Sequence, residues 1–155
     1  MRMTTKTSNL RAIITEMTSG VAKKAALSCF IPLQPVPASR PRVPRFGKPY
    51  YAGRYKEWIN AAKKLIKASD TTLEGALLVS VRQRIKPAKT TKLKSPTGDV
   101  DNFAKAPLDR LNNAKGYWVD DKQIQVLLVN KRFTLPGEAE GTMIDIFEYE
   151  NNKRR

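Results

Sequence analysis

The sequence contains no histidine and only one cysteine, Cys29. The lack of histidine excludes Ser-His-Asp and Cys-His hydrolases, nucleases that use a histidine base, and haem ligation by histidine. One cysteine cannot form an intrachain disulfide, and a structural zinc ion would lack its ligands. Catalysis by this chain must therefore use carboxylates, lysine, arginine, tyrosine, serine or threonine.

Long apolar runs are also missing, and residues 1–20 lack the apolar stretch of a secretory signal. We therefore expect a cytoplasmic protein with no membrane partner. The 155 residues, 41% of them hydrophobic, suit one compact domain. We expect it to span residues 27–150, between an N-terminal extension over residues 1–26 and a basic tail over 151–155. The extension is expected to be flexible rather than a short helix.

Acidic residues are scarce before residue 99. Residues 1–98 contain 20 Lys and Arg but four Asp and Glu, and the whole chain carries a net charge of +15. Five of the seven aspartates then fall within residues 99–121. The basic part favours binding to a polyanion such as nucleic acid, which a carboxylate cluster would repel unless it held a cation. The alternatives are that the basic charge only aids solubility and that the aspartates are caps and turn residues.

The hydrophobic pattern predicts a mixture of strands and helices. Strands are expected over residues 27–32, 76–85, 123–134 and 142–149, and helices over residues 55–68 and 102–112. Pro136-Gly137 marks a turn between the last two strands. The order has no strict βαβ rhythm. We therefore expect a single small α+β domain with a mixed β-sheet and two main helices.

The aspartates form two groups, Asp99-Val100-Asp101-Asn102 and Asp120-Asp121. In an extended segment, Asp99 and Asp101 would point the same way, with Val100 directed into the core and Asn102 capping the following helix. Asp120 and Asp121 would point to opposite sides, so only one of them would join the first pair. Three convergent carboxylates would suit Mg²⁺ or Mn²⁺.

Lys105 lies about one helical turn after Asp101 and could neutralise a phosphate oxygen or position an attacking water. The alternative is an ordinary ion pair with Asp101 or Asp109. Pro107 stands inside the expected helix, where its ring and missing N–H would kink the helix or delay its start. A kink or a later start of the helix would change the direction in which the Lys105 side chain points.

Two basic segments are candidates for binding DNA. Residues 34–55 are rich in proline, arginine and tyrosine and should be extended and irregular. Their cations could contact phosphates, and their tyrosines could stack on bases or simply pack beneath the loop, as could Trp58. Residues 86–98 form a second basic segment, either a mobile loop over the DNA or a solvated run of charge.

The order of these motifs resembles the RusA family of Holliday junction resolvases, nucleases of bacteria and their phages. The matching motifs are Phe30-Ile31-Pro32, Pro35-Val36-Pro37, Arg40-Pro41-Arg42, Gly47-Lys48-Pro49-Tyr50-Tyr51, Asp99-Val100-Asp101-Asn102, Lys105, Leu108-Asp109-Arg110-Leu111-Asn112, Asp120-Asp121-Lys122-Gln123-Ile124 and Lys131. The resemblance covers about residues 28–148. It implies a homodimer that binds four-way DNA junctions and makes paired, symmetric nicks with Mg²⁺.

The resemblance also implies roles for particular residues. Asp99, Asp101 and Asp121 would hold the metal, Asp120 would support it, and Lys105 would be catalytic. The expected DNA-binding set is Arg40, Arg42, Arg45, Lys48, Tyr50, Arg54, Lys92, Lys94 and Lys131.

The sequence thus predicts a Mg²⁺-dependent, structure-selective DNA endonuclease, with Mn²⁺ as a possible substitute. In this reading, metal-activated water attacks the phosphodiester while Lys105 and the arginines hold the phosphates. The alternatives are a non-catalytic basic DNA-binding protein and a related nuclease acting on flaps or forks. A metal-dependent glycosyltransferase is disfavoured, because the chain is short for the nucleotide-binding domain it would need.

Overall fold

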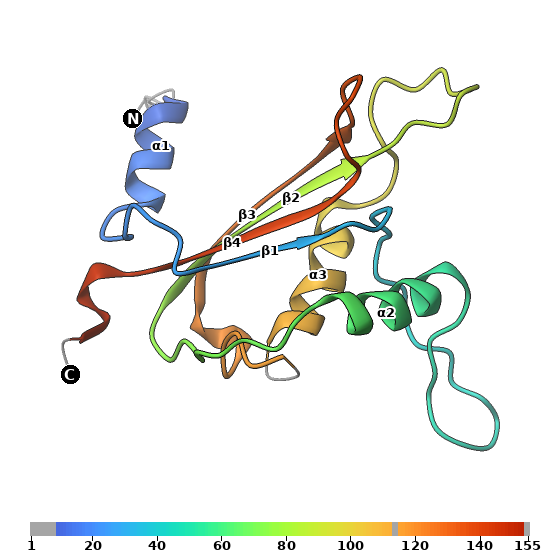
Figure 1. Cartoon of the computed structure of the whole chain (residues 1–155), viewed down its shortest axis with the longest axis horizontal. Coiled ribbons are helices and arrows are strands. Elements are labelled where there is room, and N and C mark those ends of the chain that lie inside the picture. Colours follow the sequence, from blue (N-terminus) through green and yellow to red (C-terminus); the bar gives the residue numbers. More distant parts are fainter. Residues whose placement is uncertain (1–8, 113–114, 154–155) are drawn as a thin grey trace, which may run out of the picture.

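The computed structural model describes residues 9–112 and 115–153, which form a four-stranded mixed sheet with helices on both of its faces (Figure 1). The strands are β1 (Leu27–Ile31), β2 (Leu77–Ile85), β3 (Ile124–Phe133) and β4 (Gly141–Glu148). The α-helices are α1 (Leu10–Met17), α2 (Gly53–Leu65) and α3 (Val100–Leu111), and two short 3₁₀ helices span Asp121–Gln123 and Glu150–Lys153. This architecture confirms the predicted α+β fold.

The strand order in the sheet is β1-β4-β2-β3. β4 is antiparallel to both of its neighbours, whereas β2 and β3 are parallel. A parallel pair needs a crossover, and α3 lies in the segment that connects β2 to β3. β3 and β4 follow one another in the chain but are separated in the sheet by β2.

β2 shows why one face of the sheet is the core face. Its residues at every second position, from Leu77 through Val79 and Val81, are completely buried. Side chains alternate between the two faces of a strand. The buried set therefore points toward α2 and α3, which cover one side of the sheet in Figure 1. Trp118, also completely buried, joins this cluster from the segment after α3.

The N-terminal segment contains a helix where an irregular tail was favoured. Residues 10–17 form α1 on the opposite side of the sheet from α2 and α3 (Figure 1), capped by the Asn9 side chain, which accepts a hydrogen bond from the Arg11 N–H at 2.8 Å. The segment then joins the sheet through a bridge between Val21 and Tyr149. Residues 1–8 and 154–155 of the predicted extension and tail lie outside the described residues. None of the helices described is both long and apolar enough to cross a membrane.

Pro107 lies inside α3, and the helix continues through it from Val100 to Leu111. A proline has no N–H, so the carbonyl four residues earlier, that of Phe103, loses its normal helical donor. The side chain of Gln83 replaces that donor, because its Nε2 donates to the Phe103 carbonyl at 2.8 Å. Gln83 is itself buried in the sheet, and its Oε1 accepts a hydrogen bond from the Thr142 hydroxyl. A strand side chain thus satisfies the carbonyl that Pro107 orphans and fastens α3 to the sheet.

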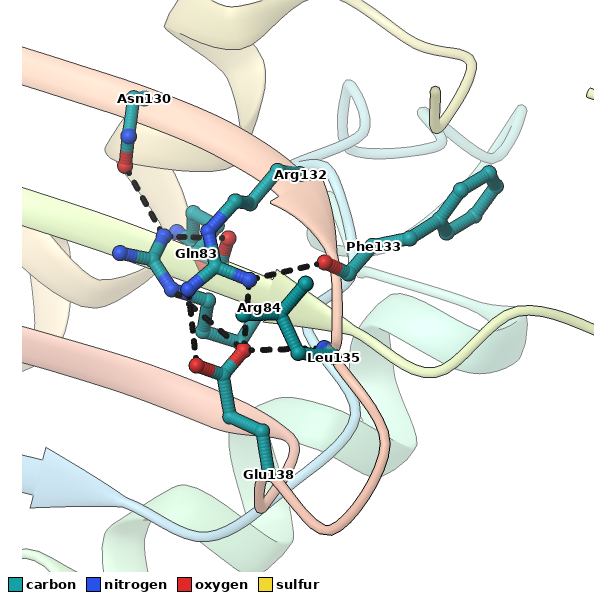
Figure 2. Close-up of polar contacts among 7 residues, drawn as sticks. All are labelled: Gln83, Arg84, Asn130, Arg132, Phe133, Leu135 and Glu138. Carbon is teal, nitrogen blue, oxygen red and sulfur yellow. Dashed lines mark hydrogen bonds and ion pairs between the residues drawn. The ribbon is translucent and has the colours of Figure 1, made fainter. Parts of the chain in front are cut away.

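On the other face of the sheet, arginines are paired with carboxylates. Glu138, in the turn between β3 and β4, accepts hydrogen bonds from both terminal nitrogens of Arg132, at 2.6 and 2.7 Å (Figure 2). Arg84 donates to Asn130 at 3.1 Å, and its Nε lies 3.9 Å from Glu138. Burial and the neighbouring Arg132 lower the pKa of Arg84. These contacts hold the β3–β4 turn against the end of β2.

The link between Gln83 and Pro107 can be tested with a double-mutant cycle. Gln83→Leu should lower the free energy of unfolding by about 1–3 kcal/mol, because the buried Phe103 carbonyl loses its donor. In a Pro107→Ala background the new N–H can reach that carbonyl, so Gln83→Leu should cost clearly less. Urea unfolding measures both values. Loss of the Thr142 contact is common to both backgrounds and cancels. An equal cost in the two backgrounds would refute the compensation.

Candidate active site and nucleic-acid interface

The Asp99–Asp101 segment is the start of a helix and not an extended strand. Asp99 is the N-cap of α3, with φ −80° and ψ 131°, and Asp101 already lies in the first helical turn. Val100 is 41% exposed rather than in the core, and Asn102 is inside the helix rather than its cap. The predicted extended geometry was therefore wrong here. Aspartate is as good an N-cap as asparagine, and the helix uses the earlier of the two.

Two features fix where this helix begins. Gly98 has φ +95°, and a Cβ at this position would lie 2.8 Å from the Phe103 ring. Only glycine fits such a position without strain. The Lys131 ammonium donates to the Pro96 carbonyl, and Lys131 stands directly opposite Gln83 on the neighbouring strand. Two adjacent strand side chains thus hold the chain just before and just after Asp99.

The carboxylates at the start of α3 are open to solvent. Asp99 and Asp101 are both exposed, and Asp99 makes no side-chain capping hydrogen bond. Neither carboxylate makes an ion pair within the described part of the chain. Their oxygens are therefore accessible to an external ligand.

A polar stripe continues along the same face of α3. Asp101, Lys105, Asp109 and Asn112 are separated by four, four and three residues, which places them on one side of a helix. Lys105 is exposed and makes no ion pair within 4 Å among the described residues, although its charge partly opposes the burial that raises the pKa of Asp109. The alternative of a close ion pair for Lys105 is therefore not the arrangement seen.

Asp121 lies at the far end of this stripe. Its Oδ1 accepts a hydrogen bond from Trp118 Nε1 at 2.7 Å and one from Asn112 Nδ2 at 3.4 Å. Asn112 follows Asp101 by eleven residues, a span of about 16 Å along a helix. The structure therefore brings Asp121 to the C-terminal end of α3, away from Asp99 and Asp101. Within the described residues, no three His, Cys, Asp or Glu side chains are grouped closely enough to hold a metal ion.

The Asp120 side chain caps the short 3₁₀ helix that follows it. Its carboxylate accepts a hydrogen bond from the Lys122 N–H at 2.8 Å, and the Gln123 side chain bonds back to the Asp120 N–H at 2.9 Å. This capping box fixes the short 3₁₀ helix that carries Asp121. Asp120 thus supports the position of Asp121, and its own carboxylate is engaged.

Asp109 is a candidate site residue that sequence reasoning weighed only as an ion-pair partner of Lys105. Burial raises the pKa of Asp109, with Asp121 adding to the effect and Lys105 and Arg110 opposing it. The Asp109 charge in turn adds to burial in raising the pKa of Tyr55 on α2. The half-buried Asp109 carboxylate thus interacts electrostatically with Lys105 on one side and with Asp121 on the other. The spacing of four residues from Lys105 was the signal for it in the sequence.

Three of the predicted DNA-binding arginines line one cavity. Arg40, Arg42 and Arg54 surround it, with Val36 and Tyr55 among its other walls, and its volume is about 420 Å³. The cavity joins the start of α2 to the preceding irregular segment. Guanidinium groups gathered around a cavity of this kind suit a phosphate group.

The segment that carries these arginines is tied to α3. The Ala38 N–H donates to the Asn102 carbonyl at 2.8 Å, next to Asp101 in the chain. Tyr51 packs edge-on against Tyr55, with ring centroids 5.0 Å apart, and Tyr55 stacks on Trp58 at 6.5 Å. Tyr55 and Trp58 are buried, so packing beneath the segment, the alternative to base stacking, is the arrangement seen for both. Tyr50 remains 46% exposed.

The second basic segment faces the first across a cleft. A cavity of about 360 Å³ is lined by Val36, Pro37 and Arg54 on one side and by Ala88, Thr91 and Pro96 on the other, with further residues at its ends. Lys92 and Lys94 of this segment are exposed. Lys131, in contrast, uses its ammonium to hold Pro96, so the structure assigns it to the loop rather than to the open surface.

Ion pairs distinguish the two sets of arginines. The ion pairs among the described residues involve Arg82, Arg84 and Arg132, all on the sheet. In the same part of the chain, the cations of residues 40–54 make no ion pair. These uncompensated cations, together with the exposed carboxylates of α3, form a surface that attracts a polyanion and presents acidic oxygens beside it.

Comparison with known proteins identifies a nuclease family whose model covers this surface. The model of one protein family, described as endodeoxyribonuclease RusA, matches residues 32–146, which is most of the chain. The comparison with curated proteins found no match. The matched range includes the arginine cavity, the whole of α3 and Asp121.

Asp109 provides a test of the electrostatics of this face. Its pKa is raised above its ordinary value of 3.8, so ionisation opposes folding, and stability is lost as pH rises from 3.8 through the raised value. Asp109→Asn should therefore raise the Tm slightly at pH 7 and leave it unchanged near pH 3. Thermal unfolding at both pH values measures this, with the exposed Asp70→Asn as the control. A lower Tm at pH 7 would mean that attraction to Lys105 and Arg110 outweighs burial.

Proposed function

The chain belongs to the RusA endodeoxyribonuclease family, and from this membership we propose that it is a structure-selective endonuclease that cuts four-way DNA junctions. The observation that carries the proposal is the direct tie between the arginine segment and α3. Ala38 and Asn102 are joined by a hydrogen bond of 2.8 Å, so the segment that carries the cavity arginines is attached to the helix turn that carries Asp101. A phosphate bound by the arginines would then lie on the same side of the molecule as the start of α3.

Mg²⁺ is the cation that we propose for the start of α3, with Mn²⁺ as a substitute. Protein sites for Mg²⁺ commonly supply only one or two carboxylates, while water and substrate phosphates complete the coordination. Asp99 and Asp101 fit that requirement, because they are exposed and free of ion pairs in the described chain. When bound, the cation would supply a water of lowered pKa and would neutralise charge on the phosphodiester.

The remaining polar residues on α3, and Asp121 at its C-terminal end, have complementary roles in this proposal. Lys105 stands one turn beyond Asp101 and would bind a non-bridging phosphate oxygen. Asp109 attracts the Lys105 ammonium and would keep it on this side of the helix. Asp121 is held by Trp118 and Asn112 and would extend the acidic surface toward the C-terminal end of the helix. Because it lies away from Asp99 and Asp101, the proposal does not use it as a third ligand of the same cation, the role that the family resemblance had implied.

A homodimer is the assembly that fits the proposed substrate. A four-way junction can adopt two-fold symmetry, and paired symmetric nicks need two active sites related by the same symmetry. Each chain would then supply one copy of α3 and one arginine cavity to the junction.

The first test is cleavage of a labelled four-way junction and a matched linear duplex, each with Mg²⁺ and with EDTA. We expect paired nicks in the junction alone, and only with Mg²⁺. Asp101→Asn should abolish cleavage while junction binding stays equal or becomes tighter, because one repulsive charge is removed. The matched control is Asp70→Asn, which changes an exposed aspartate outside α3. Retained cleavage by Asp101→Asn would refute the assignment of Asp101, and binding without cutting would favour a non-catalytic DNA-binding protein.

Salt dependence tests the arginine cavity. The logarithm of the association constant should fall linearly with the logarithm of salt concentration, with a slope of about −0.9 for each phosphate contacted on duplex DNA. Arg54→Gln should make that slope shallower by about one contact, as measured by fluorescence anisotropy on a labelled junction. Lys67→Gln, which removes a charge beyond the other end of α2, should leave the slope unchanged. Equal slopes for the wild type and Arg54→Gln would argue against a phosphate in this cavity.

A further inference from the structure

The segment between Arg42 and Tyr50 is a closed loop that projects from the molecule. The Arg42 N–H donates to the Tyr50 carbonyl at 2.6 Å, and the Tyr50 N–H donates to the Arg42 carbonyl at 2.9 Å. This pair of hydrogen bonds closes residues 43–49 into a loop, with Gly47 at φ +105° near its tip. In Figure 1 the loop extends beyond α2, clear of the sheet and of the other helices. Its base is closed by these two hydrogen bonds, and its tip projects away from the rest of the molecule.

The tip presents an apolar ring to solvent. Phe46 is 85% exposed, which is more than any other large hydrophobic residue described, and Val43 of the same loop is 76% exposed. The Arg45 guanidinium lies 5.8 Å from the centre of the Phe46 ring. A ring placed so far from the core contributes nothing to the packing of the fold. Its position suits a partner that offers a flat apolar surface.

The charges around the ring identify the chemistry of that partner. Residues 17–56 contain no Asp or Glu, and the loop and its base carry five cations: Arg40, Arg42, Arg45, Lys48 and Arg54. A partner that fits must therefore combine dense negative charge with exposed flat rings. Nucleic acid has this combination, with phosphates outside and base faces within. An apolar side chain on a basic loop can enter between bases and partly unstack them.

We propose that Phe46 inserts between bases at the branch point of a DNA junction and stacks on one of them, while Arg45 and Lys48 hold the flanking phosphates. The inference rests on the proposed function and adds to it a residue that recognises the branched structure. Bases at a branch point lack a continuous stack on one side, so opening them costs less than opening a linear duplex. Insertion would thus favour branched over linear DNA, a preference that phosphate contacts alone do not provide.

The test uses a four-way junction with 2-aminopurine next to the branch point, because the fluorescence of this base rises when it is unstacked. The matched probe is a linear duplex with 2-aminopurine in the same sequence context. Binding is measured in EDTA, so that the DNA stays intact. The wild type should raise the fluorescence of the junction and not that of the duplex. Phe46→Ala should lose most of that rise, bind the junction about tenfold more weakly and cut it correspondingly more slowly with Mg²⁺, while its affinity for the linear duplex stays unchanged.

Two further variants separate stacking from other effects. Phe46→Trp keeps an aromatic face and should retain both the fluorescence rise and the cleavage rate. Leu135→Ala removes another large exposed side chain, 61% exposed in the β3–β4 turn, and should behave as the wild type. Because Phe46 is so exposed, Phe46→Ala should not change the stability of the fold, which thermal unfolding checks.

The outcomes distinguish this inference from the proposed function. If the wild type binds and cuts the junction but Phe46→Ala gives the same fluorescence and rate, the inference is overturned and the proposed function stands. If Phe46→Ala alters only the oligomeric state in light scattering, the loop contacts protein and the inference is again overturned. If the wild type neither binds nor cuts any branched DNA, the proposed function fails and the inference fails with it.

Discussion

The hydrogen bond from the Gln83 side chain to the Phe103 carbonyl fastens α3 to the sheet, and that helix carries the candidate catalytic groups. The bond exists because Pro107 leaves the carbonyl without its helical donor. Without a replacement, a buried carbonyl would be unsatisfied at considerable cost in free energy. The replacement comes from the sheet, so helix and sheet are joined at the point where Asp101 and Lys105 emerge. On the neighbouring strand β3, Lys131 makes a similar hydrogen bond, to the Pro96 carbonyl just before α3.

Much of the fold follows from local patterns in the sequence. The alternation along residues 77–85 places β2 correctly, and the helical spacing of Trp58 and its neighbours places α2. The start of α3 could not be predicted in the same way. Over three residues, an alternating pattern is shared by a strand and by the first turn of a helix, and both Asp99 and Asn102 are good caps. The effect of Pro107 depends on Gln83, which lies 24 residues earlier in the chain and on a different element.

The candidate site, too, could be predicted from the sequence only in part. Residue types indicate which segments are basic or acidic, but only the contacts in the structure show which of these groups are already paired. Sequence composition identifies the basic segments, and three predicted arginines do meet around one cavity. Composition does not show which cations are already paired. Arg132 is committed to Glu138 (Figure 2) and Lys131 to a loop carbonyl, whereas the cations of residues 40–54 make no ion pair in the described chain. The separation of Asp121 from Asp99 likewise depends on the length of α3, which sets the two ends of the acidic stripe apart.

The order of strands in the sheet has a consequence for how the chain is made. Among the described residues β1 pairs with β4 alone, and Leu27 stands opposite Ile146, so this contact joins residues more than a hundred positions apart. During synthesis, β1 is made before β4 and cannot form this ladder until β4 has been made. β2 likewise has no strand to pair with until β3 has been made. Long-range pairings of this kind slow folding, because distant segments must be brought together before the contacts stabilise them. The sheet, including the β2 strand that anchors α3, therefore has all its neighbours in place only after β4 has been made.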